Sequence, residues 1–237
     1  MNELKISIKN KENKVVELDK FSALNIEVLD DSFLTLKLAN FGNSENIKIS
    51  AKVGRNSHLA VFFADFAQSN ISFKSVVDLV EEGASCMWHL ATLSNSNFNK
   101  VFDVSFNHIV GHTEALMDNY GVAKDKSNIV FSGCNHILNG SKQSNTKQNA
   151  KIIVFDKEAH GTASPILKID ENDVKASHGA VVGQLNSDHM FYLMSRGLNK
   201  EEARMVITLG YLKPISNNFS EAIQNKIEQA IKEAMWW

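Results

Sequence analysis

The thiols and imidazoles of this sequence are the side chains that could do chemistry, and few of them have a short spacing. Cys134 and His136 are two residues apart, so in an extended segment both side chains lie on one face, where an imidazole could activate a thiol. Their β-carbons would nevertheless be roughly 7 Å apart, and no third residue is placed to orient the imidazole. The spacing therefore favours a structural pairing over a nucleophile pair.

Two further histidines have the spacing of a metal site. His108 and His112 are four residues apart, as two ligands on one turn of a helix would be. Gly111 and the alternating pattern around it favour a strand, in which four residues span about 13 Å, too far to share one ion. Cys86 lies near Trp88 in an apolar run, and we expect it to be a buried thiol.

His178 differs from these residues because it stands between a serine and a glycine. The pattern places it after the last strand and before a helical tail, which is not an obvious position for a core residue. A neutral imidazole is a competent iron ligand, and it titrates near physiological pH. Taken alone, His178 is more readily interpreted as a structural histidine than as a functional one.

Several motifs are absent from the sequence. It lacks the loop G-x-x-x-x-G-K-[ST], so we expect no ATP hydrolysis by this chain alone, and it lacks a dinucleotide fingerprint for a flavin. It has no C-x-x-C pair that would bind zinc or a cluster locally. A β-helix enzyme acting on polysaccharide would need clustered carboxylates, and Asp103, Glu114 and Asp118 are scattered. Such an enzyme is the remotest alternative.

Charge and composition limit the classes of partner. The chain has 237 residues and a formal net charge of −2, which gives no electrostatic reason to expect a nucleic acid or an anionic membrane as a partner. No apolar run approaches the roughly 18 residues that span a bilayer, and residues 1–6 lack the apolar core and cleavage site of a signal peptide. Two cysteines are too few for a disulfide framework, so we expect free thiols in a reducing, cytoplasmic compartment.

Alternating apolar and polar residues from residue 1 to about 180 predict β-strands with one buried face. In residues 46–53, for example, three isoleucine or alanine side chains and one valine alternate with polar ones. Short turns rich in glycine, asparagine and serine separate such runs, and no helix-length segment that would form a βαβ unit lies between them. The rhythm fits a sandwich, a barrel or a solenoid, and without a strict repeat it does not choose among them.

The character of the sequence changes after residue 186. A short helix is predicted over 187–195, with Gly197 as its C-terminal stop. Asn199 and Glu202 have the spacing of a capping box, which predicts that a second helix begins there.

The second helix is expected to bury one apolar stripe and to end at Pro214. Residues at helical spacing define that stripe as Ala203, Val206, Ile207, Gly210 and Tyr211. A third helix is predicted over 217–235, with an apolar side formed by Phe219, Ile223, Ile227 and Ile231. The expected organisation is therefore a β-domain over 1–186 followed by a helical domain over 187–237.

The segments on both sides of that boundary resemble a known family. The resemblance lies in residues 164–170, 173–180, 182–185, 191–198 and 202–204. In this order and spacing they resemble the C-terminal signature of the SufB/SufD family of iron–sulfur cluster assembly scaffold proteins. The Ser-His-Gly sequence around His178 is the form of SufD-like members, whereas SufB-like members have Glu-His-Glu-Ala there. On this count the chain is most similar to SufD.

The resemblance implies a right-handed parallel β-helix, or solenoid, followed by a small C-terminal helical domain, in agreement with the predicted β-body and tail. It also implies a non-catalytic scaffold subunit of the SufBCD complex. In that family SufD pairs with SufB through the β-helices, and the helical tails dock SufC, an ATPase. ATP hydrolysis is therefore expected from the partner SufC.

The resemblance further implies roles for particular residues. His178 corresponds to the histidine at the SufB–SufD interface that is associated with cluster formation. There it would serve as a metal ligand or a local proton carrier for a transient iron–sulfur cluster. No permanently bound cofactor is expected. The region that binds SufC corresponds to Tyr192, Arg196, Gly197, Leu198 and Arg204.

Two departures from the family pattern matter. Ala176 stands where many SufD proteins have a cysteine, so a contribution of this chain to a cluster site would rest on His178 and Cys134. Full-length members carry an N-terminal helical region, whereas strands begin here almost at Met1, so a short form is expected. The alternative is a self-associating minimal scaffold, in which a homodimer holds a nascent cluster through Cys134 and His178.

Overall fold

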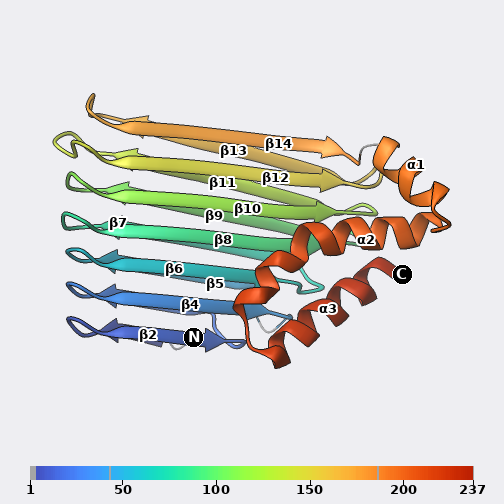
Figure 1. The fold of residues 1–237 in the computed structure, drawn as a ribbon, viewed down its shortest axis with the longest axis horizontal. Coiled ribbons are helices and arrows are strands. Elements are labelled where there is room, and N and C mark those ends of the chain that lie inside the picture. Colours follow the sequence, from blue (N-terminus) through green and yellow to red (C-terminus); the bar gives the residue numbers. More distant parts are fainter. Residues whose placement is uncertain (1–3, 43, 186, 237) are drawn as a thin grey trace.

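A computed structural model describes residues 4–42, 44–185 and 187–236 of the chain. The described β-strands wind into a parallel β-solenoid of about six turns, and three α-helices follow at the C-terminal end of the chain (Figure 1). The predicted parallel β-helix with a helical tail is thus confirmed. The solenoid was one of three architectures that the strand rhythm alone allowed.

Two seven-stranded parallel sheets form the walls of the solenoid, and the chain alternates between them. Sheet A contains the odd-numbered strands β1 (Leu4–Ile8), β3 (Ala23–Val28), β5 (Asn46–Val53), β7 (Ile71–Leu79), β9 (Asn99–His108), β11 (Asn128–Ile137) and β13 (His160–Ile169). Sheet B contains the even-numbered strands β2 (Asn13–Leu18), β4 (Phe33–Asn40), β6 (His58–Asp65), β8 (Ser85–Ser94), β10 (Glu114–Ala123), β12 (Asn145–Val154) and β14 (Lys175–Gln184).

The length of one coil increases along the solenoid. Phe33 pairs with His58, 25 residues later, whereas Glu114 pairs with Asn145, 31 residues later. The turn from sheet A to sheet B nevertheless keeps its backbone shape. A residue with left-handed backbone stands two positions before a strand of sheet B in six successive coils, at Lys11, Asp31, Asn56, Gly83, His112 and Gln143.

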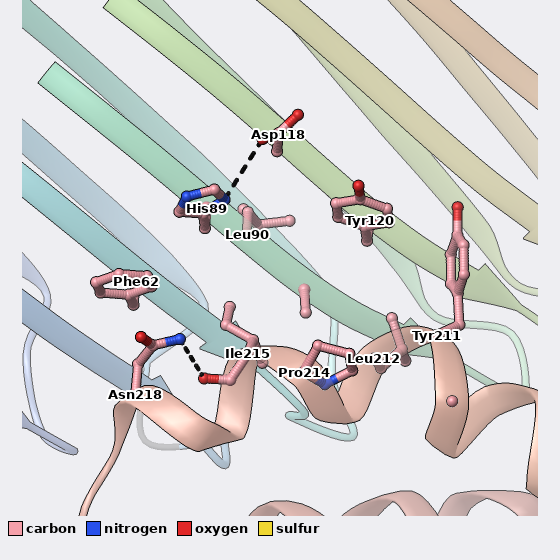
Figure 2. A pocket seen from close by; sticks show the side chains of 12 residues that line it. Phe62, His89, Leu90, Asp118, Tyr120, Tyr211, Leu212, Pro214, Ile215 and Asn218 are labelled. Carbon is pink, nitrogen blue, oxygen red and sulfur yellow. Dashed lines mark hydrogen bonds and ion pairs between the residues drawn. The ribbon is translucent and has the colours of Figure 1, made fainter.

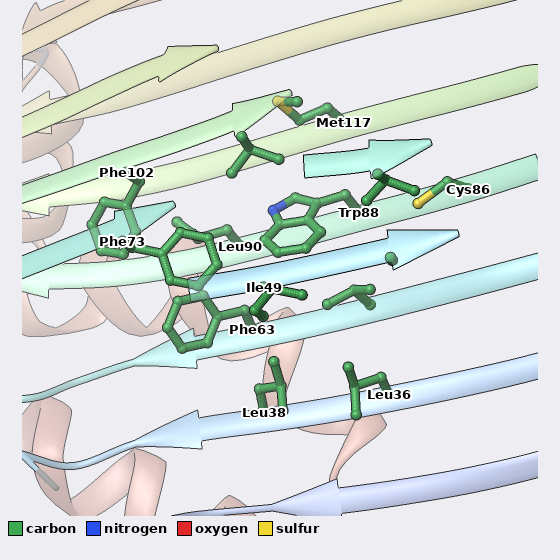
Figure 3. Packing of buried hydrophobic residues seen from close by; sticks show 14 of the residues in the cluster. Leu36, Leu38, Ile49, Phe63, Phe73, Cys86, Trp88, Leu90, Phe102 and Met117 are labelled. Carbon is green, nitrogen blue, oxygen red and sulfur yellow. The ribbon is translucent and has the colours of Figure 1, made fainter. Parts of the chain in front are cut away.

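Side chains of successive coils stack in rows inside the solenoid because neighbouring parallel strands are in register. Aromatic residues fill the middle of this core, where the ring centroids of Phe63 and Phe73 are 4.8 Å apart and those of Phe73 and Phe102 are 5.9 Å apart (Figure 3). Trp88 lies fully buried beside them. This continuous core holds the sheets at a fixed distance and makes the strands a rigid platform.

The tail consists of α1 (Ser187–Ser195), α2 (Lys200–Leu212), the 3-10 helix η1 (Lys213–Asn218) and α3 (Glu221–Trp236). The predicted capping box is present, since the Asn199 side chain accepts from the Glu202 N–H and the Glu202 side chain accepts from the Asn199 N–H. The four apolar residues predicted for the third helix are buried, but α3 begins only at Glu221, so Phe219 lies before it. Figure 1 shows α2 and α3 lying against the ends of the sheet B strands.

The predicted buried stripe of α2 is wrong in part: Ala203 is buried, and Ile207 and Tyr211 are half-buried. The residues that the structure buries are Ala203, Met205, Thr208 and Leu212, while Val206 is 46% exposed and Gly210 is also exposed. The prediction counted side chains by hydrophobicity and left Thr208 out. Thr208 can be buried between α2 and α3 because its hydroxyl donates to Sδ of Met235 in α3 at 3.6 Å, which offsets the loss of water.

The tail packs on the outer face of sheet B, where small residues let the helices approach. Ala39, Ala64 and Ala91 belong to one buried cluster with the apolar side of α3. Polar contacts fix both ends of α3, since Glu17 accepts from the Ser220 N–H at 2.8 Å and Lys124 donates to the Ala234 carbonyl at 2.9 Å. The division into domains over 1–186 and 187–237 stays a prediction.

Candidate functional site

The last coil of the solenoid leaves its inner surface uncovered. β13 and β14 are the edge strands of sheets A and B, and every residue of β14 is exposed. Side chains that would be interior in an earlier coil face solvent there, because the described part of the chain adds no further coil above them (Figure 1). The uncovered surface therefore presents core-type residues to solvent.

His178 occupies an inner position of this last coil. It pairs in register with Gln148 of β12, which pairs with Met117 of β10, which in turn pairs with Trp88 of β8. Trp88, Met117 and Gln148 are 3% exposed or less, whereas His178 is exposed. Because parallel strands in register keep the same side-chain direction, His178 continues a buried row into solvent.

The predicted local structure around His178 is wrong in one respect. The sequence placed this histidine after the last strand, but it lies within β14, Lys175–Gln184. The glycines and alanine near His178 suggested a turn, because strand alternation is hard to see where small residues occupy both faces. Pairing with β12 over ten residues nevertheless holds the segment extended.

Exposed apolar side chains share the inner face of the last coil with His178. Val182 is 42% exposed, whereas its register partner Ile152, one coil earlier, is 2% exposed. Ile169 is 38% exposed and its partner Ile137 is fully buried. Burial of such side chains contributes about 25 cal/mol per Å² of apolar surface removed from water, so a partner that covers this layer would gain hydrophobic free energy.

The edges of the last coil are also long. β13 and β14 have 10 residues each, compared with 5 and 6 residues in β1 and β2. A long edge strand presents a row of backbone donors and acceptors that another strand can pair with. The last coil thus combines apolar surface, an open backbone edge and one imidazole.

Cys134 and His136 lie side by side on the outer face of sheet A, as their spacing predicts, but each has its own partner. His136 Nε2 is 2.7 Å from Oδ2 of Asp170, and this hydrogen bond, aided by Lys168, holds the pKa of Asp170 below its usual value. The Cys134 backbone N–H donates to Oγ of Ser105. The hydrogen bond with Asp170, the residue that follows β13, orients the His136 ring.

The structure does not bring Cys134 and His178 together within one chain. Cys134 points outward from β11 in sheet A, whereas His178 is on the inner side of β14 in sheet B. Among the described residues, no group of three or more histidine, cysteine, aspartate or glutamate side chains could hold a metal ion. His178 would thus need ligands from another molecule to take part in a metal site.

The other sulfur and nitrogen candidates are structural. Cys86 is 2% exposed, and burial raises the pKa of its thiol, as expected for an inert buried cysteine. His108 is buried with Nδ1 2.8 Å from the Thr113 hydroxyl, and burial lowers its pKa to about 4. His112 is exposed in a left-handed turn, so the two histidines are not a ligand pair.

The residues predicted to bind SufC fall into two groups. Tyr192, Arg196, Gly197 and Leu198 lie on α1 and the connection to α2, where the Arg196 guanidinium stacks 5.2 Å from the Tyr192 ring centroid. α1 has no buried residue, and its exposed face includes Phe191, 75% exposed, and Met194, 46% exposed.

Arg204 belongs to the second group because it faces the solenoid. Its guanidinium donates to Oδ1 of Asp156 at 2.9 Å and to the Phe155 carbonyl at 3.1 Å. The same group lies 5.2 Å from the Phe155 ring centroid. Arg204 therefore ties α2 to the loop after β12, which its sequence context did not indicate.

Comparison with models of known protein families identifies the family of this chain. A model described as SUF system FeS cluster assembly, SufBD core domain, matches residues 22–211, which include most of the solenoid, α1 and α2. The chain belongs to this SufBD core family. The predicted membership of the SufB/SufD family is thus confirmed.

Curated relatives carry names from the same system. The iron–sulfur cluster assembly protein SufD of Bacillus subtilis is 34% identical over 132 residues, or 55% of this chain and 30% of the relative. An iron–sulfur cluster assembly SufBD family protein of Synechocystis is 32% identical over 133 residues, or 54% of this chain and 28% of the relative. The chain therefore matches less than a third of the length of these relatives.

Two features of the site escaped the sequence reasoning. The exposed inner row of the last coil was missed because the coil number of each strand is needed to find it. A cleft between sheet B and the tail was missed as well, since its residues come from strands one coil apart.

In the described segments of the chain, no helix combines the length and apolarity needed to cross a membrane.

Proposed function

We propose that this chain is a SufD-like scaffold subunit for iron–sulfur cluster assembly, and that its last coil is the surface that pairs with a SufB-like partner. The observation that carries this proposal is the buried row that continues into solvent at His178. Membership of the SufBD core family supports the assembly role. The names of the relatives, SufD among them, support the SufD-like assignment.

Pairing at this surface would place His178 in an interface. A partner strand adding to the open edge of β14 would cover Val182 and Ile169 and remove the imidazole from water. A neutral imidazole there could bind iron of a transient cluster or carry a proton for it. The thiolates would come from the partner, since Ala176 stands near His178 and Cys134 faces away.

The tail would dock a SufC-like ATPase through α1. Phe191, Tyr192 and Met194 form an exposed apolar face, and no described residue of the chain covers it. The sequence has no phosphate-binding loop, so ATP hydrolysis would come from this partner and the chain itself would be non-catalytic. Both cysteines are free, which fits work in the reducing cytoplasm.

Co-purification tests the proposal. The tagged chain is mixed with the SufB-like and SufC-like proteins of the same source, and we expect a stable three-protein complex. Val182→Asp places a charge on the exposed layer and should abolish association with the SufB-like protein. The matched control Val15→Asp changes a valine that is 63% exposed on β2, at the other end of the solenoid, and should leave the complex intact.

Two results would contradict the assignment. If the chain fails to associate with either protein, or if Val182→Asp and Val15→Asp have the same effect, the last coil is not the partner surface. Recovery of the chain as a homodimer that carries iron and sulfide would favour the self-associating scaffold. The open edge of β14 could also pair with a second copy of itself.

A further inference from the structure

A cleft of about 430 Å³ opens between the outer face of sheet B and the tail. Its floor comes from β6, β8 and β10, and its wall from α2 and η1 (Figure 2). This volume is within the range of small-molecule sites, roughly 300–1,000 Å³. The cleft is separate from the last coil, and nothing in the scaffold role proposed above uses it.

Four of the residues that line the cleft have aromatic rings. Phe62 stacks on the imidazole of His89, with ring centroids 5.4 Å apart and planes 13° apart. Tyr120 and Tyr211 meet edge to face at 5.2 Å, one from β10 and the other from α2. Flat ring faces of this kind attract planar aromatic molecules and organic cations.

One carboxylate supplies the charge of the cleft. Asp118 is held in place because the Asn149 amide donates to its Oδ1 at 2.8 Å, while its Oδ2 lies 3.6 Å from Nδ1 of His89, beyond a hydrogen bond. Figure 2 shows the carboxylate beside His89 and on the same side as the Tyr120 hydroxyl. Its side chain is 18% exposed, so a ligand in the cleft can reach it.

The remaining lining groups carry no opposing charge. Burial lowers the pKa of His89 although Asp118 acts in the opposite direction, which favours the neutral imidazole. Burial also raises the pKa of Tyr120 and Tyr211, which keeps both hydroxyls protonated. Lys151 stands over the Tyr120 ring at 5.8 Å but is not part of the lining. The lining therefore has a formal charge of −1 from Asp118.

We propose that this cleft binds a small planar aromatic molecule with a cationic, hydrogen-bond-donating group, such as an aromatic amidine or amine. Its ring would lie among Phe62, Tyr120 and Tyr211, and its donor group would bind Oδ2 of Asp118. Such a ligand contacts the solenoid and the tail together, so its binding stabilises the docked position of the tail.

Three probes of the same shape test the charge requirement. Benzamidine is a cation, benzamide is neutral and benzoate is an anion, and binding of each to the full chain is measured by two-dimensional NMR titration. We expect saturable benzamidine binding with shifts at cleft residues and a raised Tm. Benzamide should bind about ten-fold or more weakly because it lacks the charge-assisted hydrogen bond. Benzoate should not bind.

Variants of the lining test its position. Asp118→Asn keeps the shape of the side chain and removes the charge, so it should weaken benzamidine about ten-fold and bring it close to benzamide. The matched control Asp103→Asn removes an outward carboxylate from sheet A and should leave binding unchanged. Tyr211→Leu should weaken both benzamidine and benzamide, since it removes an aromatic wall while retaining apolar bulk.

Two results would overturn the proposal. Equal binding of benzamidine and benzamide, or of benzamidine to wild type and Asp118→Asn, would show that the carboxylate recognises no cation. Absence of saturable binding by every probe, combined with protection of cleft residues when partner proteins are added, would assign the cleft to a side chain of a partner. Neither result would affect the last coil, so the scaffold proposal is tested separately.

Discussion

Two surfaces of the same solenoid are apolar, and only one of them is covered by helices of the chain. The outer face of sheet B, at the ends of β4 to β10, is covered by α2, η1 and α3, and Ala39, Ala64 and Ala91 are buried beneath them. The inner face of the last coil, on β13 and β14, is left uncovered by the described part of the chain. Both surfaces are apolar, but only the first is matched by helices of the chain itself.

The two surfaces also differ in their polar contacts. Arg204 binds Asp156, Lys124 binds the end of α3, and Glu17 binds its beginning, so polar contacts fix both α2 and α3 to the solenoid. On the last coil, His178 has an exposed imidazole in an interior row. The covered surface therefore belongs to the fold, whereas the uncovered one has the properties of an interface with another molecule.

The largest expected effect is a difference in stability between two variants that place aspartate at positions one coil apart. Ile152→Asp would bury a charge without a partner and should prevent folding, whereas Val182→Asp, at its exposed register partner, should change the free energy of unfolding by less than about 0.5 kcal/mol. Urea unfolding followed by circular dichroism measures both variants. If Val182→Asp also unfolds the isolated chain, the last coil is part of the packed core and the comparison fails.

A smaller loss is expected under the tail. Ile227→Ala leaves a cavity between α3 and sheet B and should lower the free energy of unfolding by about 2–5 kcal/mol. Val206→Ala, on the exposed side of α2, should change it by less than about 0.5 kcal/mol. Chemical denaturation of the two variants checks this contrast. Equal losses would mean that the tail is not packed as described.

The polar anchor of α2 should contribute less than the apolar one. Arg204→Ala removes donors to Asp156 and to the Phe155 carbonyl and should cost about 1–3 kcal/mol. Arg196→Ala, in which an exposed arginine stacked on Tyr192 is lost, serves as the matched control and should be near neutral. Equal stability of the two variants would contradict an anchoring role for Arg204.

The smallest effect is the pH dependence of that anchor. Burial alone would raise the pKa of Asp156, but the Asp125 N–H and the Arg204 guanidinium together hold it below 3.8, its ordinary value. Because the folded pKa is depressed, its contribution is present above the unfolded pKa and is lost as the pH falls through the folded one. The stability difference between wild type and Asp156→Asn should therefore begin to shrink as the pH falls toward 3.8 and should continue to shrink below it, through the folded pKa. A constant difference would exclude this linkage.

The sequence predicted most of the architecture because strand alternation and helix caps are local signals. The capping box of Asn199 and Glu202 and the apolar side of α3 needed no tertiary information. The solenoid itself could not be read from the rhythm alone. Paired residues of sheet B lie 20 residues apart in its first pair of strands and 31 apart between β10 and β12, so the spacing drifts and no strict repeat appears.

The site could be predicted only in part, because burial depends on what lies one coil away. His178 was found through a resemblance, but its place in a buried row follows from the register with Gln148 and Met117. The cleft has a signal of the same kind, since Phe62, His89 and Asp118 are consecutive members of one outward row. That signal becomes visible once the coil length is known.

Hydrogen–deuterium exchange of the backbone amides can show whether a partner covers the last coil. The free chain is compared with the chain bound to the SufB-like protein of the same source, and exchange in β14 is followed against exchange in β2. We predict that β14 amides exchange rapidly in the free chain and gain protection in the complex, while β2 is unchanged. A stable complex in which β14 exchanges as fast as before would contradict the account.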